Sequence, residues 1–229
     1  MTKVLSAVML AVLFASCTGG PRKQFQATME TPQPGIGPGP SVIIDYKNKE
    51  AGGTIPEWVN RWLVGGSGGI ETMDAYLSRY AFVAHAEGNN FNALTQWSKG
   101  FSPDLDFPRL AAARVEARFS SDVPFPDNEY GSFFEALIRA ASDASWTGAE
   151  RVDDFWVYRK FFPSGAGGED QGSLTEDESW EYMILVTIDR ASFISQFETI
   201  FQSVKPSPLP SKAQISAANR VKDRLDEGF

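Results

Sequence analysis

The sequence is poor in the two residue types that most often build reactive sites, since 229 residues contain one cysteine and one histidine. A single cysteine cannot form an intramolecular disulfide, so the fold must be stabilised by its hydrophobic core. Cys17 and His85 alone cannot supply the nitrogen and sulfur ligands of an ordinary zinc site. We therefore predict a chain with no metal ion, no cofactor and no catalytic residues.

Basic clusters and long apolar runs are also missing. The formal net charge is −8, so the chain has no electrostatic surface for nucleic acid and is repelled by anionic headgroups. The longest apolar run, residues 4–14, rises about 16 Å as a helix, whereas the hydrocarbon core of a bilayer is about 30 Å thick. A transmembrane anchor is therefore disfavoured, although it stays open as an alternative.

The same apolar run is typical of an export leader, because it follows Lys3 and ends in small residues. The order Phe-Ala-Ser-Cys at its end resembles a lipobox, with Phe14 where leucine is usual. In a lipobox the cysteine receives diacylglycerol, and signal peptidase II then cleaves before it, here between Ser16 and Cys17. We predict a signal peptide at 1–16 and a lipid on Cys17; an ordinary secretory signal is the other open alternative.

Export and lipidation predict a place in the bacterial envelope, attached to the membrane through Cys17. Thr18 follows the cysteine where an aspartate would act as a retention signal, which favours the outer membrane over the inner one. Residues 17–54 are predicted to be the lipidated N-terminus and a tether, because 18–40 contains five prolines and five glycines. As a coil, those 23 residues would span about 25–30 Å.

Beyond the tether, the patterns predict one α+β domain over residues 55–204, with a small antiparallel sheet packed against several helices. Period-two alternation and β-branched or aromatic residues mark the strands, and Pro56 and Pro108 each open a helix. The predicted strands are 79–87, 152–162 and 182–188, with 41–46 as a further short candidate and with a long acidic loop at 165–180.

The last segment, 205–229, is predicted to be a proline-rich linker followed by an amphipathic helix. The narrow apolar stripe of this helix could dock on the domain or on a partner protein, and docking on its own domain is favoured.

Five segments carry a resemblance to a known family: 56–59 (Pro-Glu-Trp-Val), 111–117 (Ala-Ala-Ala-Arg-Val-Glu-Ala), the strand pieces 156–158 and 183–186, and the helix 193–201. Together they resemble the Lpp-twenty family of bacterial envelope lipoproteins over residues 55–204. The resemblance implies a small α+β fold without enzymatic chemistry, and it implies a place in an envelope or motility-associated assembly.

Residues 65–69 match G-x-S-x-G, the turn that presents the nucleophile in serine hydrolases. Only His85 could activate Ser67, yet it follows 18 residues later with no multistranded parallel sheet between them. His85 also alternates with Tyr80 and Phe82, so we expect it on the opposite face of its strand. A glycine-rich turn is the preferred interpretation, and a hydrolase at Ser67 is the least favoured function.

Carboxylates and tryptophans offer two further sites. A solvated acidic surface is the preferred interpretation of the carboxylates. The candidates for weak calcium binding or for a glycosidase pair are Asp104 and Asp106, Asp153 and Asp154, and the acidic loop, but adjacent strand carboxylates point to opposite faces. Aromatic faces can also stack on sugars, and the tryptophans that could face such a ligand are Trp58, Trp62 and Trp97.

These observations predict a lipid-anchored envelope lipoprotein with a non-enzymatic role, either structural or in binding another envelope protein. The alternative is a module that binds peptidoglycan or another glycan through exposed tryptophans. The exposure of those tryptophans and the distance from Ser67 to His85 separate the three functions.

Overall fold

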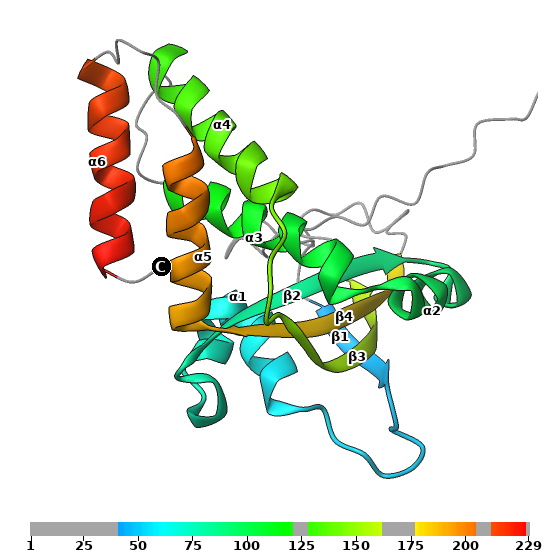
Figure 1. The fold of residues 1–229 in the computed structure, drawn as a ribbon. Helices are drawn as coiled ribbons and strands as arrows, with labels where there is room; N and C mark the ends of the chain where they lie inside the picture. Colours follow the sequence, from blue (N-terminus) through cyan, green and yellow to red (C-terminus); the bar gives the residue numbers. More distant parts are fainter. Residues whose placement is uncertain (1–40, 121–127, 162–176, 205–211, 228–229) are drawn as a thin grey trace, which may run out of the picture.

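The computed structural model describes residues 41–120, 128–161, 177–204 and 212–227, which form a four-stranded antiparallel sheet and six α-helices (Figure 1). This is the predicted α+β fold in a single domain. In chain order the elements are β1 Ser41–Tyr46, α1 Glu57–Glu71, the 3-10 helix η1 Asp74–Tyr76, β2 Arg79–Gly88, α2 Phe91–Gly100, α3 Pro103–Ser120, α4 Asn128–Asp143, β3 Glu150–Phe161, β4 Asp177–Asp189, α5 Arg190–Ser203 and α6 Lys212–Glu227.

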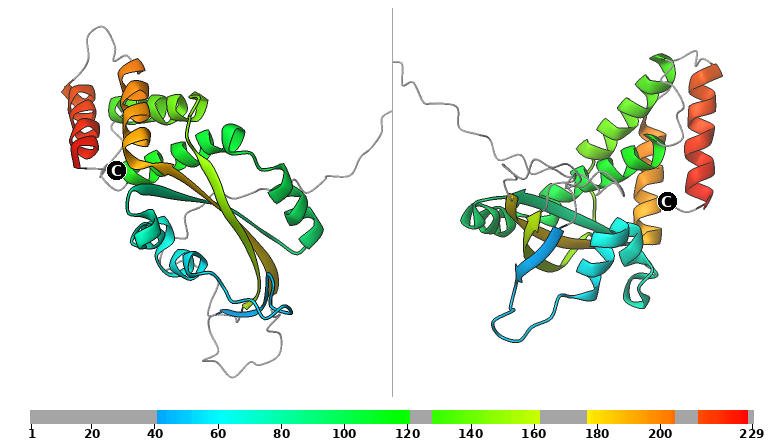
Figure 2. Two further views of the ribbon diagram at one scale, coloured as in Figure 1. Left: turned by 60° about the horizontal axis from the view of Figure 1, so that its bottom comes forward. Right: turned by 180° about the vertical axis from the view of Figure 1, so that it is seen from behind.

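The strands lie in the order β1-β3-β4-β2, and every neighbouring pair is antiparallel. Helices α3, α4, α5 and α6 lie on one side of the sheet, while α1 lies on the other (Figures 1 and 2). Helix α2 lies at one end of the sheet and packs against β2 and β4. The sheet therefore separates two hydrophobic layers.

The larger layer lies between the sheet and helices α2 to α6. Tyr80 and Phe82 of β2 point into it, while Ala81 and Val83 point to the other face, as the alternation of a strand requires. Phe193 of α5 is fully buried at the centre of this layer. Its partners are aromatic: Trp146 stacks on it at 4.9 Å, and Tyr80 meets it edge to face at 5.2 Å between ring centroids.

The smaller layer lies between the sheet and α1, which buries Trp58, Val59 and Trp62 against β2, β3 and β4. The glycine run that we expected to break the chain lies within this helix. Only Gly66 departs from helical geometry, with φ 59° and ψ −154°, and the helix kinks there. Gly69 then passes so close to Arg61 that an added Cβ would lie 2.6 Å from the Arg61 carbonyl oxygen.

Two predicted boundaries at the sheet are wrong. The candidate strand at 41–46 is confirmed as β1, which pairs with β3 and forms one edge of the sheet, so the folded domain begins at Ser41, inside the predicted tether. Strand β4 begins at Asp177, inside the predicted acidic loop, because its first residue pairs with Phe161, the last residue of β3. The other residues of that loop, 165–176, lie outside the described part of the chain.

Helix α3 also begins earlier than predicted, at Pro103, so Pro108 lies within the helix. The Ser102 carbonyl accepts the backbone N–H groups of Leu105 and Asp106, and the Asp106 carboxylate accepts the backbone N–H of Ser102 at 2.9 Å. These bonds fix the first turn at Ser102, and Pro103 stands where its missing N–H costs nothing.

The last helix belongs to the same domain. Ala217 and Val221 of α6 are fully buried in the larger layer, and α6 packs against α4. The prediction that its apolar stripe docks on its own domain is therefore confirmed.

An ion-pair cluster covers the outer edge of β2. Oε1 of Glu71, at the end of α1, accepts the Ala81 backbone N–H at 2.9 Å and Nη1 of Arg114 at 2.6 Å. Arg114 also donates to the Ala81 carbonyl at 3.3 Å and lies 4.4 Å above the Tyr80 ring. Arg190 approaches Oε2 of Glu71 at 3.5 Å. Because both backbone groups of Ala81 are engaged, another strand cannot pair with β2 at this point.

Candidate functional site

Ser67 lies inside the kinked helix α1 rather than at a turn between a strand and a helix, which is where a hydrolase nucleophile stands. Within the described residues, no hydrogen bond joins Ser67 to His85. His85 has a different partner, because its Nε2 lies 2.9 Å from Oε1 of Glu181 on the neighbouring strand. The structure therefore gives the G-x-S-x-G match no catalytic geometry.

His85 faces away from Tyr80 and Phe82, as predicted, and belongs to a polar group on the α1 side of the sheet. Glu181 lies between His85 and Arg159, whose Nη1 donates to Oε2 of Glu181 at 3.0 Å. Burial raises the pKa of Glu181, whereas the contacts with His85 and Arg159 lower it. The lowering outweighs the effect of burial, so the net pKa is below its usual value. Glu181 is therefore ionised at neutral pH, which suits a structural ion pair rather than a general acid.

The three tryptophans that we considered as possible ligand-facing residues do not share a groove. Trp58 and Trp62 are 4% and 2% exposed, and they lie under α1 on one side of the sheet. Trp58 Nε1 donates to Oδ2 of Asp153 at 2.8 Å. Trp97 lies on α2, on the opposite side of the sheet, and is half-buried. Trp58 and Trp62 are therefore excluded as ligand-facing residues, because their ring faces are used for packing.

A different set of rings gathers beside α2. Four partly exposed side chains form what we call the aromatic cluster: Phe91 of α2, Trp156 and Tyr158 of β3, and Trp180 of β4. Trp180 stacks on Tyr158 at 4.3 Å between ring centroids, with 24° between the ring planes. Phe91 lies 4.5 Å from Trp180, and Trp156 meets both of them at 5.1 Å. The cluster extends the larger hydrophobic layer toward the surface.

Hydrogen-bonding groups flank the aromatic cluster on both sides. At one end, the Tyr158 hydroxyl donates to Oε2 of the exposed Glu178 at 2.6 Å, and this bond raises the pKa of Tyr158. At the other end, the Tyr182 hydroxyl and Nζ of Lys47 donate to Oδ1 of Asp154 at 2.9 and 2.6 Å. Carboxylate oxygens therefore lie at both edges of the rings.

Asp154 is the better connected of these two carboxylates, since Arg151 donates to its Oδ2 at 2.8 Å. Burial raises the pKa of Asp154, whereas the hydrogen bonds from Lys47, Arg151 and Tyr182 lower it. The hydrogen bonds outweigh the effect of burial, so the net pKa is below its usual value. Asp153 points to the opposite face of β3, toward Trp58. The prediction that adjacent strand carboxylates diverge is therefore confirmed.

The carboxylates of this site do not form a metal centre. Throughout the described ranges, no group of three histidine, cysteine, aspartate or glutamate side chains is placed to hold a metal ion. Asp106, one of the carboxylates considered for calcium, pairs with Arg109.

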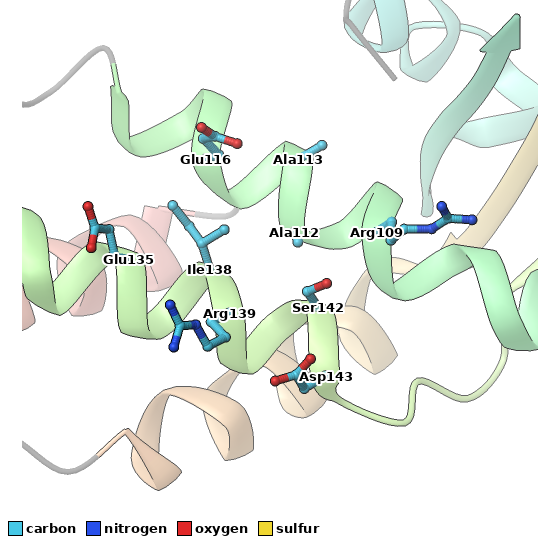
Figure 3. A pocket seen from close by; sticks show the side chains of 9 residues that line it. All are labelled: Arg109, Ala112, Ala113, Glu116, Glu135, Ile138, Arg139, Ser142 and Asp143. Atoms are coloured by element: carbon cyan, nitrogen blue, oxygen red, sulfur yellow. The ribbon is translucent and has the colours of Figure 1, made fainter. Parts of the chain in front are cut away.

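A separate groove of about 490 Å³ lies between α3 and α4 (Figure 3). Ala112 and Ala113 of α3 line it, together with side chains of both charges. It is lined by Arg109, Ala112, Ala113, Glu116, Glu135, Ile138, Arg139, Ser142 and Asp143. The groove brings no set of convergent polar groups and rings together, so the aromatic cluster is the better candidate for a binding site.

The sequence contained the signal for the aromatic cluster. Trp156 pairs with Tyr182, and Tyr158 pairs with Trp180, across two strands that we predicted to be antiparallel. Directly opposite residues share a face of the sheet. Trp180 was missed because it was assigned to the acidic loop rather than to β4.

Cys17, the predicted lipidation site, and Ser16 lie outside the described residues, together with the rest of 1–40. Among the helices that the structure describes, none has the length and hydrophobicity that crossing a membrane requires. Comparison of the chain with protein-family models, with curated proteins and with solved structures finds no match. The resemblance to the Lpp-twenty family therefore stays a prediction.

Proposed function

We propose that this chain is a lipid-anchored bacterial envelope lipoprotein whose folded domain acts by contact rather than by catalysis. One observation carries the proposal: an apolar leader follows Lys3 and ends in a lipobox-like tetrapeptide at Cys17, the only cysteine. Diacylglycerol on that cysteine supplies two acyl chains, and two chains anchor a protein stably where one does not.

The contact role is supported by how the domain uses its polar side chains. Glu181 is engaged by His85 and Arg159, and Glu71 is engaged by Arg114 and Arg190. These groups stabilise the sheet and its edge. Because Ser67 lies within a helix and has no hydrogen bond to His85 among the described residues, this pair does not form an assembled nucleophile and base. The outer membrane is the favoured location, with an envelope or motility-associated assembly as the setting.

Metabolic labelling tests the proposal. The full chain is expressed in a bacterium fed an alkyne-tagged fatty acid, alongside a Cys17→Ser variant that differs by one atom. We expect the wild-type chain to carry the label, to fractionate with membranes and to accumulate as a larger precursor when signal peptidase II is inhibited.

The Cys17→Ser variant should lack the label and stay unprocessed by signal peptidase II. Equal labelling of the two chains, or a wild-type chain without label, would contradict the proposal. Crosslinking of the intact protein in its native envelope then identifies the partner of the folded domain.

A further inference from the structure

We propose that the aromatic cluster of Phe91, Trp156, Tyr158 and Trp180 is a binding site for a neutral glycan strand of the N-acetylhexosamine class. The inference deepens the proposed envelope function, which supplies the setting in which such a strand is encountered. The site itself is argued from the geometry of the β3–β4 pair.

The first argument is the order of side chains along the two strands. On one face, β3 presents Asp154, Trp156, Tyr158 and Lys160 in alternate positions, and β4 presents Glu178, Trp180 and Tyr182 beside them. The rings of β3 therefore lie between charged residues at both ends, whereas on β4 Glu178 lies at one end of the row and the buried Ile184 follows Tyr182 at the other. At about 3.3 Å per residue, the row from Asp154 to Lys160 covers about 20 Å, which suits an extended polymer better than a single small molecule.

The second argument is that the rings are accessible. Phe107 and Phe193 in the same layer are fully buried, whereas every ring of the aromatic cluster is partly exposed. Helices α3 to α6 cover other parts of this face, and α2 contributes only Phe91 to the cluster. The negative face of an exposed aromatic ring attracts the weakly positive C–H groups that line one face of a pyranose ring.

The third argument concerns the polar edges. The carboxylates of Glu178 and Asp154 each have more acceptor capacity than their present bonds use. They can accept hydrogen bonds from sugar hydroxyl groups and from the N–H of an acetamido group. The two positive charges of Lys47 and Arg151 balance the two carboxylates of Asp154 and Glu178, and the chain as a whole is acidic at −8. An anionic ligand would be repelled by this overall charge, so a neutral glycan is the occupant that the chemistry favours.

The test titrates the purified full chain with N-acetylglucosamine hexamer and follows tryptophan fluorescence and binding heat. We expect saturable binding by the wild-type chain. Tyr158→Ala should weaken it by about tenfold or more because it removes a stacking face, whereas Tyr158→Phe should retain it within about threefold. Glu178→Gln changes an exposed residue and should weaken binding without affecting folding. Tyr76→Ala is the matched control on the opposite side of the sheet, and it should bind like the wild-type chain.

The proposal is overturned if the folded wild-type chain shows no saturable binding, or if Tyr76→Ala weakens binding as much as Tyr158→Ala. Binding of an extended proline-rich peptide in place of the hexamer would also overturn it and would assign the cluster to a protein partner. Circular dichroism of each variant checks folding; if Tyr158→Ala does not fold, Glu178→Gln and Tyr158→Phe decide. The outcome is independent of Cys17: glycan binding without lipidation contradicts only the proposed anchor, and lipidation without glycan binding contradicts only this inference.

Discussion

Replacing Glu71 with glutamine should destabilise the domain far more than the same change at Glu57. The Glu71 side chain is 10% exposed, and its carboxylate accepts bonds from Arg114 and from the Ala81 backbone, with Arg190 nearby. Glu57 is 62% exposed and pairs with Arg61, one helical turn away. Each substitution therefore removes one negative charge. Glu71→Gln removes it from a buried network of ion pairs, and Glu57→Gln removes it from an exposed pair.

The structure sets the size of the difference. Breaking a buried ion pair costs about 3–5 kcal/mol because the partner charge is left uncompensated. The glutamine side chain would retain one acceptor oxygen, and the Arg190 side chain is 36% exposed, so we expect Glu71→Gln to cost about 2–4 kcal/mol. An exposed pair of the type formed by Glu57 and Arg61 contributes about 0.5 kcal/mol or less.

Urea unfolding of the full chain, followed by tryptophan fluorescence in a lipid-free Cys17→Ser background, measures both values. Adding Arg114→Met to Glu71→Gln removes the arginine charge that Glu71→Gln leaves unpaired. The double variant should therefore lose less unfolding free energy than the two single variants together, by about 1 kcal/mol or more. If the losses of unfolding free energy in Glu71→Gln and Glu57→Gln differ by less than about 0.5 kcal/mol, the stabilising role assigned to the ion-pair cluster at the edge of β2 is wrong.

Two further predictions concern pH and backbone space. Because the folded-state pKa of Asp154 is lowered, its stabilising effect is complete above the unfolded value near 4 and is lost as the pH falls through the folded value. Unfolding free energies measured from pH 7 to pH 2 should therefore fall less steeply in Asp154→Asn than in the wild-type chain; parallel curves would contradict this. Gly69→Ala should destabilise by about 1–3 kcal/mol because its Cβ would meet the Arg61 carbonyl oxygen. Gly65→Ala, with open space around its Cβ, should be neutral or stabilising by up to about 1 kcal/mol. Denaturation of the pair checks this, and equal losses would contradict it.

Local signals were sufficient to predict most elements of the fold. The alternation around Phe82 predicted β2, and Pro56 directly precedes helix α1, which begins at Glu57. The features that the sequence did not predict depend on contacts between distant parts of the chain. The pairing of β1 with β3 joins residues more than 100 positions apart, and period alone does not reveal which short apolar segment finds a place at a sheet edge.

The candidate site shows the same limit. Exposure of a tryptophan depends on which helix covers it, so Trp58 and Trp62 could not be distinguished from Trp156 by composition or spacing. Once the register of β3 and β4 is known, Trp180 falls beside Tyr158 on an accessible face. The G-x-S-x-G match failed for a related reason, since the same five letters fit a kinked helix as well as a nucleophile turn.

The central claim is that lipid on Cys17, rather than a stretch of peptide, attaches this domain to a membrane. The most direct measurement is the mass of the N-terminal peptide of the chain extracted from bacterial envelopes. We predict a peptide that begins at Cys17 and carries diacylglycerol. A peptide that begins at Cys17 with an unmodified thiol, or a chain that retains residues 1–16, would contradict the claim.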